Sequence, residues 1–371
     1  MMQNVKISSY QFLVLVILFT IGTSILILPS DLAENAKQDA WIAAIIGTGI
    51  GLLIIWLFTK IGFWFPKLTY VQVNELLFGK WIGKALSLLF VFATFLFTAT
   101  LMYYSGTFLT LHVMPNTPMA ATNTLLAIVL VMAVRLGLET IARSAEIFIA
   151  VFFLLFFLLV VSISPEVRIE NIQPILEADI KSIAQSSLFL IVTSSVDAVC
   201  LLMIFPAFIN QPKSAKKTFL IGNLIGGLVV IIITMLCILV LGADLTARQM
   251  YPSYGLAKKV NIGNFVTRIE ATMVALWLIC LFTKMVLYFY ASIFGLGQIL
   301  NLKDYRPLTY PLGLIVVILS LVIFPNVIYQ QKFSTTTELY FSLTIGIFLP
   351  LLMVIVYAIR KKQLKKNPDH S

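Results

Sequence analysis

Two ionisable residues stand in the middle of long apolar stretches of this 371-residue chain. Asp197 lies in "IVTSSVDAVC", residues 191–200, and Lys284 lies in "LFTKMVLYFY", residues 281–290. A charge in hydrocarbon costs at least about 2.5 to 3.5 kcal/mol, so such a residue normally has a partner or a function. The two residues predict a shared aqueous cavity or a direct or water-bridged pair. The alternative is that the two residues have no role in ligand binding: they form a static ion pair, or the lysine side chain extends to the membrane surface.

A second polar group interrupts the first apolar stretch. "FTIGTSILILPS", residues 19–30, places Gly22, Thr23 and Ser24 together and Pro29 at the far end. In hydrocarbon, a break in a helix is tolerated where the freed backbone groups face protein or a water-filled cavity. Small residues also allow a neighbouring helix to approach closely. The stretch therefore predicts either a broken helix or a close helix contact.

These two interruptions together provide groups that bind a zwitterion. Backbone N–H groups at 22–24, at the start of a half-helix, suit a carboxylate. Free carbonyls near 18–22 and 190–194, with the hydroxyls of Thr193 and Ser194, suit an ammonium group. Selectivity for the side chain of the ligand is expected from two further places in the sequence. One is the apolar stretch in which Phe97, Thr98 and Leu101 fall at helical spacing, and the other is Thr283, beside Lys284.

The amino-acid composition indicates whether these groups lie in a membrane or in water. Hydrophobic residues make up 60% of the chain and charged residues 11%, with a mean hydropathy of +0.99, whereas soluble proteins carry roughly 25% charged residues. The chain is an integral membrane protein, and nothing in it suggests nucleic-acid binding. Cys200, Cys237 and Cys280 are far apart, and neither His112 nor His370 has a metal-ligand neighbour, so we expect no metal and no cofactor. No motif for a hydrolase or a phosphate-binding enzyme is present, and we expect no enzymatic activity.

Apolar runs long enough to cross a bilayer recur along the whole sequence. They predict an all-α membrane protein with ten spans, at 10–29, 41–64, 84–111, 120–137, 145–163, 184–208, 218–241, 270–297, 309–328 and 337–359. Spans one and six run in opposite directions and both carry polar interruptions, which is the pattern of an inverted 5+5 repeat with broken helices 1 and 6. We expect one membrane domain, with repeat one at about 10–163 and repeat two at about 184–360.

The distribution of basic residues predicts the orientation. Most of the 26 Lys and Arg residues fall on one side if the ten spans are threaded in order, which places both termini in the cytoplasm. The C-terminal tail, 360–371, is basic. It is either an anchor to anionic lipid or a stop-transfer cluster.

Several stretches resemble a known family. "IGTSILILP", residues 21–29, resembles the first-helix motif of amino acid/polyamine/organocation permeases, and "FLIVTSSVDAVCLLMIFPAFINQPKSAKK", residues 189–217, resembles their sixth helix. The length, the ten spans, "FGKWIGK" and "LGADLTARQMYPSYGLAKKV" are more specifically similar to spore germination permeases, the B subunits of endospore germinant receptors. Many superfamily members carry Gly where this chain has residues 193–195.

The resemblance implies a leucine-transporter-like fold in the plasma membrane or spore inner membrane. It implies a small germinant, often an amino acid, sensed together with an A subunit and a lipoprotein C subunit. It also implies a sodium site between spans one and eight, where the ammonium of Lys284 would take the cation's place. A proton-coupled amino acid transporter and an ion or water conduit remain alternatives, because sensing and transport use one site.

Overall fold

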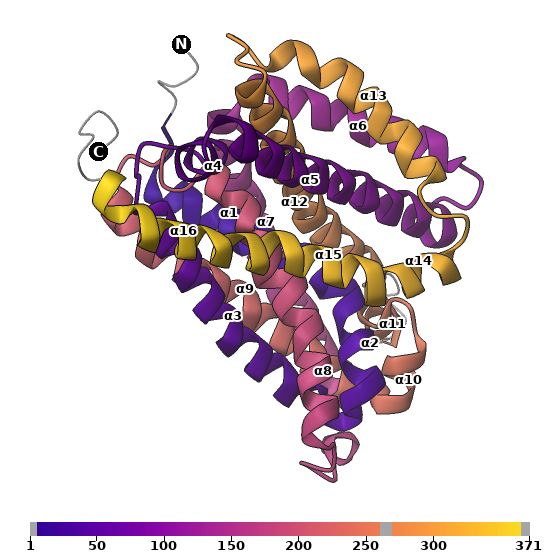
Figure 1. Cartoon of the computed structure of the whole chain (residues 1–371). Helices are drawn as coiled ribbons and strands as arrows, with labels where there is room; N and C mark the ends of the chain where they lie inside the picture. The colour runs from indigo at the N-terminus through magenta and orange to yellow at the C-terminus, as the bar shows by residue number, and fades with distance from the viewer. Residues whose placement is uncertain (1–5, 260–268, 365–371) are drawn as a thin grey trace.

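Helices occupy all ten predicted spans in the computed structural model, which describes residues 6–259 and 269–364 (Figure 1). Eight helical stretches of the described chain are long and apolar enough to cross a membrane, and Ser9–Ile21 and Arg306–Val322 are shorter apolar stretches. The spans are α1 (Ser9–Ile21) with α2 (Ser24–Ala36), α3 (Ala40–Gly62), α5 (Lys80–Phe108), α6 (Met119–Leu136), α7 (Leu138–Ile163), α8 (Ile180–Leu190) with η5 (Ile191–Val196) and η6 (Asp197–Met203), α9 (Pro212–Leu241), α12 (Glu270–Ile299), α13 (Thr309–Val322), and α14 (Val327–Phe333) through α15 (Leu339–Leu343) to α16 (Leu349–Leu364).

The interrupted helices lie inside the bundle. α1 packs against α9 and α12, α2 packs against α8, and α12 packs along α5. Short helices lie outside the ten spans: α4 (Tyr70–Phe78), α10 (Ala243–Arg248) and α11 (Pro252–Lys259). The start of α1 and the end of α16 lie at the same end of the bundle, at the upper left of Figure 1, as an even number of spans requires.

The first span is broken between α1 and α2. Gly22 has φ +37°, a left-handed conformation that side chains other than glycine rarely adopt, and its N–H bonds the Leu18 carbonyl at 2.9 Å to end α1. α2 then begins at Ser24, with Thr23 as N-cap and no side-chain cap bond. The first N–H groups of a helix lack an acceptor within the helix. The break therefore presents the N-terminus of a half-helix in the middle of the protein.

Pro29 lies inside α2, where it leaves a carbonyl without its helical donor. A proline has no N–H, so Pro29 cannot bond the carbonyl of Ile25 four residues earlier. Ser253 of α11 replaces that donor, because its hydroxyl bonds the Ile25 carbonyl at 2.6 Å. Hydroxyl side chains commonly satisfy backbone groups that proline frees in membrane helices.

Ser253→Ala is therefore expected to lower the free energy of unfolding by about 1 to 3 kcal/mol, the cost of a buried acceptor without a donor. The double variant Pro29→Ala with Ser253→Ala should recover part of that loss, since an alanine in place of the proline restores a backbone N–H for Ile25. Thermal melting of the detergent-solubilised variants measures both. The control is Ser164→Ala, whose exposed hydroxyl bonds only Val161 nearby. Equal melting temperatures for wild type and Ser253→Ala would show that the contact carries no stability.

The second interruption keeps its helical winding. Instead of an extended linker, the chain passes from α8 into a π-helical turn, η5, and then into a 3₁₀ helix, η6. The change from i→i+5 to i→i+3 bonding removes regular partners from carbonyls at the transition. Side chains of other helices bond two of them: Lys284 Nζ donates to the Thr193 carbonyl at 2.6 Å and Asn223 Nδ2 to the Ser194 carbonyl at 3.4 Å.

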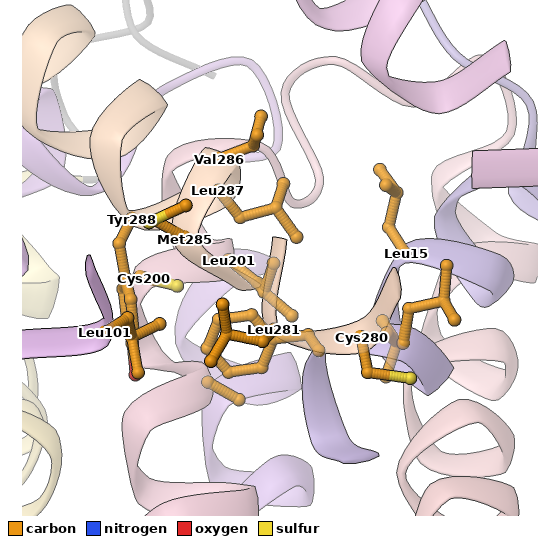
Figure 2. Close-up of a cluster of buried hydrophobic side chains, with 14 of the residues drawn as sticks. Leu15, Leu101, Cys200, Leu201, Cys280, Leu281, Met285, Val286, Leu287 and Tyr288 are labelled. Atoms are coloured by element: carbon orange, nitrogen blue, oxygen red, sulfur yellow. The ribbon is translucent and has the colours of Figure 1, made fainter. Parts of the chain in front are cut away.

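A core of buried hydrophobic side chains holds the two interruptions against the long helices. Figure 2 shows the buried side chains where α1, α5, η6 and α12 meet; those labelled are Leu15, Leu101, Cys200, Leu201, Cys280, Leu281, Met285, Val286, Leu287 and Tyr288. The three cysteines of the chain are all free and buried. This packing fixes the angle at which α12 presents Lys284 to the break in the first span.

Candidate functional site

A cavity of about 80 Å³ lies between the two interruptions. It is lined by α2, α5, α8, η5, η6 and α12, and by the segment from α14 through η8 (Ser334–Glu338) to α15. A water molecule needs about 10 to 15 Å³ of such space. The cavity is therefore large enough for several waters or for the polar head of a small ligand.

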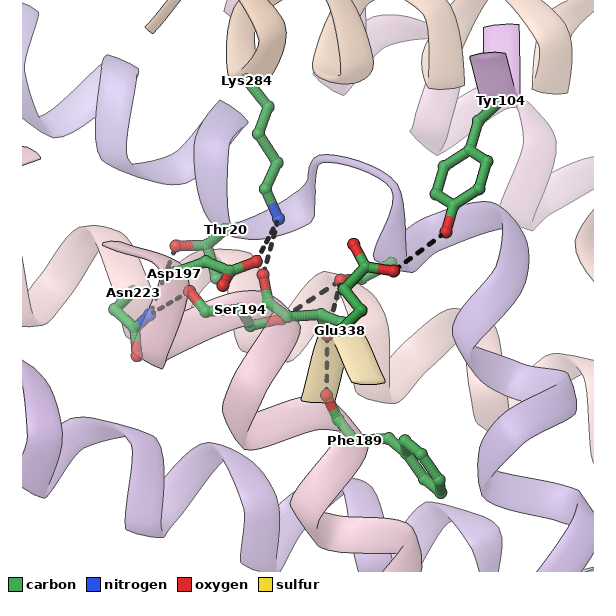
Figure 3. Close-up of polar contacts among 10 residues, drawn as sticks. Thr20, Tyr104, Phe189, Ser194, Asp197, Asn223, Lys284 and Glu338 are labelled. Atoms are coloured by element: carbon green, nitrogen blue, oxygen red, sulfur yellow. Dashed lines mark hydrogen bonds and ion pairs between the residues drawn. The ribbon is translucent and has the colours of Figure 1, made fainter. Parts of the chain in front are cut away.

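Lys284 reaches the inner end of this cavity from α12. Its side chain is only 2% exposed; its Nζ donates to the Thr193 carbonyl and lies 3.7 Å from Asp197 Oδ2 (Figure 3). The same Nζ lies 5.0 Å from the centre of the Phe19 ring and 5.8 Å from that of Tyr288. A carboxylate, a carbonyl and two aromatic faces thus surround the ammonium, which is how a buried cation is stabilised in a membrane protein.

Asp197 is only partly satisfied by this lysine. Its side chain is 12% exposed, and Oδ1 has no hydrogen-bond partner in the described part of the chain. The same holds for the hydroxyl of Tyr288, a fully buried neighbour of the carboxylate. Buried polar groups are nearly always hydrogen-bonded. Because the two groups are neighbours, they can pair with each other or with a water molecule or ligand in the cavity.

A hydroxyl and amide network joins the two interrupted helices beside the cavity. Ser24 Oγ lies 3.3 Å from Ser194 Oγ and 3.5 Å from Thr193 Oγ1, across the gap between α2 and η5. Asn223 of α9 donates to Thr20 of α1 at 3.3 Å and to the Ser194 carbonyl. These bonds link the two interruptions to each other and to α9.

The sequence of residues 6–330 matches the family described as spore germination proteins. The chain belongs to the spore germination permease family. Among its relatives, spore germination protein KB of Bacillus subtilis is 29% identical over 99% of this chain and 98% of its own length. Spore germination protein YndE of the same organism is 24% identical over 96% of this chain and 98% of its own length. The expected family is thereby confirmed.

Solved structures confirm the leucine-transporter-like fold of this permease. MhsT in complex with L-phenylalanine superposes with a TM-score of 0.70 at 13% identity, covering 96% of this chain and 99% of its own. Mhp1, a nucleobase-cation-symport-1 transporter with bromovinylhydantoin bound, gives a TM-score of 0.61 at 12% identity, covering 97% of this chain and 80% of its own. At these identities the likeness concerns the fold.

The structure brings most of the predicted ligand residues of this permease to one cavity. Those that line it are Thr23, Ser24, Phe97, Leu101 and Thr193, together with the charged pair Asp197 and Lys284. Gly22 and Ser194 do not line the cavity but are adjacent in sequence to lining residues. Gly22 lies beside the aliphatic part of the Lys284 side chain, and Ser194 is hydrogen-bonded to Ser24.

Thr98 and Thr283 do not line the cavity. The Thr98 hydroxyl is fully buried and bonds the Thr94 carbonyl in its own helix. Thr283 bonds Ile279 and lines a different pocket, with residues of α6 and α7. Since consecutive residues of an α-helix point about 100° apart, a helix that aims Lys284 at the cavity turns Thr283 away from it.

Several polar residues of the cavity have no ligand role predicted from the sequence, namely Asp31, Tyr104, Tyr288, Gln330, Ser334, Thr335, Glu338 and Ser342. Tyr104 lies near the end of the third predicted span, where interfacial aromatic residues are common. Asp31 and Glu338 fall at the ends of predicted spans. Carboxylates are ordinary at such positions, and only their convergence across the fold distinguishes these two.

Proposed function

We propose that this chain is the ligand-sensing, permease-like B subunit of a spore germinant receptor and that it binds a small germinant, an amino acid, in this cavity. The observation that supports the proposal is the position of the cavity at the crossing of the two interrupted helices. Transporter folds place their substrates there. The MhsT structure carries an amino acid, L-phenylalanine, in the same fold.

The groups on the cavity suit the two charges of an amino acid. The carboxylate is received by the N–H groups at the start of α2, next to Thr23 and Ser24, where a helix N-terminus favours an anion. Lys284 already donates to the Thr193 carbonyl, so one lone pair of this oxygen remains for the ligand's ammonium. Asp197 Oδ1 and the Tyr288 hydroxyl are the other inner polar groups that can receive it. Phe97 and Leu101 contact the side chain.

The family supports the proposed assembly. The B subunit acts in the spore inner membrane with an A subunit and a lipoprotein C subunit, and both of its termini are cytoplasmic. Membrane lipid surrounds the ten spans. Genes for A and C subunits beside this gene would favour the receptor, and an isolated gene would favour a transporter.

Binding without chemical change is the expected behaviour of the purified protein. Incubation with a mixture of the twenty amino acids, followed by washing and mass spectrometry of the released ligand, should recover one or a few of them unaltered. Boiled protein is the control for non-specific retention. Recovery of a chemically altered amino acid, or of none above the control, would contradict the proposal.

The proton-coupled transporter is a second candidate, favoured by the buried Lys284–Asp197 pair, since the pKa of a buried lysine shifts readily. Proteoliposomes distinguish the two functions. A sensor binds its ligand but shows no ligand accumulation driven by a pH gradient, whereas a proton-coupled transporter accumulates ligand and stops when the gradient is removed.

A further inference from the structure

One wall of the cavity carries a cluster of oxygen acceptors that the inner site does not use. Asp31 of α2 and Glu338 of η8 both line it, as does Gln330 of α14. Tyr104 of α5 donates its hydroxyl to Glu338 Oε2 at 3.3 Å, as Figure 3 shows. The cluster therefore joins three parts of the chain that are far apart in sequence, around residues 31, 104 and 330–338.

Gln330 provides an independent sign of a missing partner. Its side chain is only 4% exposed, and its Oε1 has no hydrogen-bond partner in the described residues. An amide oxygen is an acceptor only. A buried acceptor next to two carboxylates is satisfied by a donor or a cation, and an anionic ligand group supplies neither.

Charge within the cavity is also unbalanced. Asp31, Asp197 and Glu338 line it, and Lys284 is the sole lysine or arginine among its described lining residues. At the inner end of the cavity, the ammonium of Lys284 already contacts Asp197 and donates to the Thr193 carbonyl. Asp31, Asp197 and Lys284 all lie within electrostatic reach of Glu338. A zwitterion has no net charge, so its binding does not supply a positive charge for both Asp31 and Glu338.

We propose that Asp31, Glu338 and Gln330 form a subsite for a monovalent cationic group. This group is either an ammonium on the side chain of the ligand or a free alkali ion bound with it. The assignment rests on the proposed function, since it adds a second contact to the same ligand cavity. No group of three His, Cys, Asp or Glu side chains in the described chain is placed to hold a metal ion.

Two isosteric variants test the subsite: Asp31→Asn and Glu338→Gln, each of which removes a charge and keeps an acceptor. Glu170→Gln, at an exposed position of η4 (Ile169–Ile172) outside the cavity, is the matched control. Dissociation constants for lysine and its neutral analogue norleucine are measured by calorimetry in choline chloride and again in potassium chloride. Melting temperatures with methylammonium, potassium or choline chloride at equal ionic strength give a readout that needs no amino acid.

If the cationic group belongs to the ligand, wild type in choline chloride should bind lysine at least about tenfold more tightly than norleucine. Tenfold is the smallest difference in affinity that we expect from a desolvated charge pair. A free ion predicts instead that potassium raises the affinity for norleucine to a similar extent. In either case Asp31→Asn and Glu338→Gln should lose the effect and Glu170→Gln should keep it.

Equal binding of lysine and norleucine in both salts, or an effect that survives in both cavity variants, would overturn the subsite and leave the proposed function standing. If neither amino acid binds, the mass-spectrometric test above decides the proposed function and the melting temperatures decide the subsite. Stabilisation of wild type, but not of Glu338→Gln, by methylammonium or potassium supports it. No difference from choline rejects it.

Discussion

Replacing Gly22 with leucine is expected to abolish ligand binding while the protein still accumulates in the membrane. A Cβ at this position would lie 2.5 Å from Lys284 Cδ and 2.8 Å from the Phe19 carbonyl oxygen, and φ of +37° is unfavourable for leucine. Backbone strain of about 1 to 3 kcal/mol and overpacking of a similar size would move Lys284 away from the Thr193 carbonyl. Because α1 and α2 are anchored separately by their packing, the bundle should still assemble.

Ligand affinity and membrane abundance are the two measurements for this variant. Gly49→Leu is the matched control, since nothing lies within 4 Å of a Cβ at Gly49. Ser194→Leu should act like Gly22→Leu, because it removes the hydroxyl contact to Ser24. Normal abundance together with normal binding in both Gly22→Leu and Ser194→Leu would mean that the interruption serves packing alone.

Neutralising one member of the Lys284–Asp197 pair is expected to be more damaging than neutralising both. Removing one partner of a buried pair typically costs about 3 to 5 kcal/mol, because the other charge stays buried without compensation. Lys284→Met also leaves the Thr193 carbonyl without its donor. Both Lys284→Met and Asp197→Asn should therefore lose abundance or ligand response, and the double variant should recover abundance better than either single variant.

Chromatographic abundance of fluorescently tagged protein measures this recovery. Lys181→Met, at an exposed position at the start of α8, controls for the loss of a lysine. Additive losses in the double variant would show that the two side chains do not act as a pair. Normal ligand response in Lys284→Met, or a requirement for sodium that persists in Glu338→Gln, would contradict the hypothesis that Lys284 replaces a bound sodium ion.

The wild-type arrangement explains why the two interruptions take different forms. At Gly22 the chain needs a left-handed residue, and the absence of a side chain also makes room for the stem of Lys284. At Thr193 and Ser194 the hydroxyl residues allow the helix to continue with a changed bonding pattern, since side chains from α12 and α9 satisfy the carbonyls. The Gly-rich motif of other superfamily members is therefore not required for an interruption at this position.

Sequence alone determined the class of protein, the number of spans and the places where they are interrupted. Hydrocarbon penalises each polar residue where it stands, so a run of apolar residues, a glycine or a buried charge is informative without knowledge of its neighbours. Gly22, Asp197 and Lys284 were recognisable for this reason. The family resemblance rested on the same local stretches.

Only the tertiary structure decided which side chains meet. The rotation of α12 about its axis turns Lys284 toward the cavity and Thr283 away from it, and packing against α5 sets that rotation. Asp31 and Glu338 each look like ordinary carboxylates at the end of a span, and their proximity depends on how α2 and η8 cross in space. The free-energy cost of a polar residue in hydrocarbon and the spacing of residues can be read from the sequence. Which distant residues meet depends on helix packing, and no local sequence pattern specifies that packing.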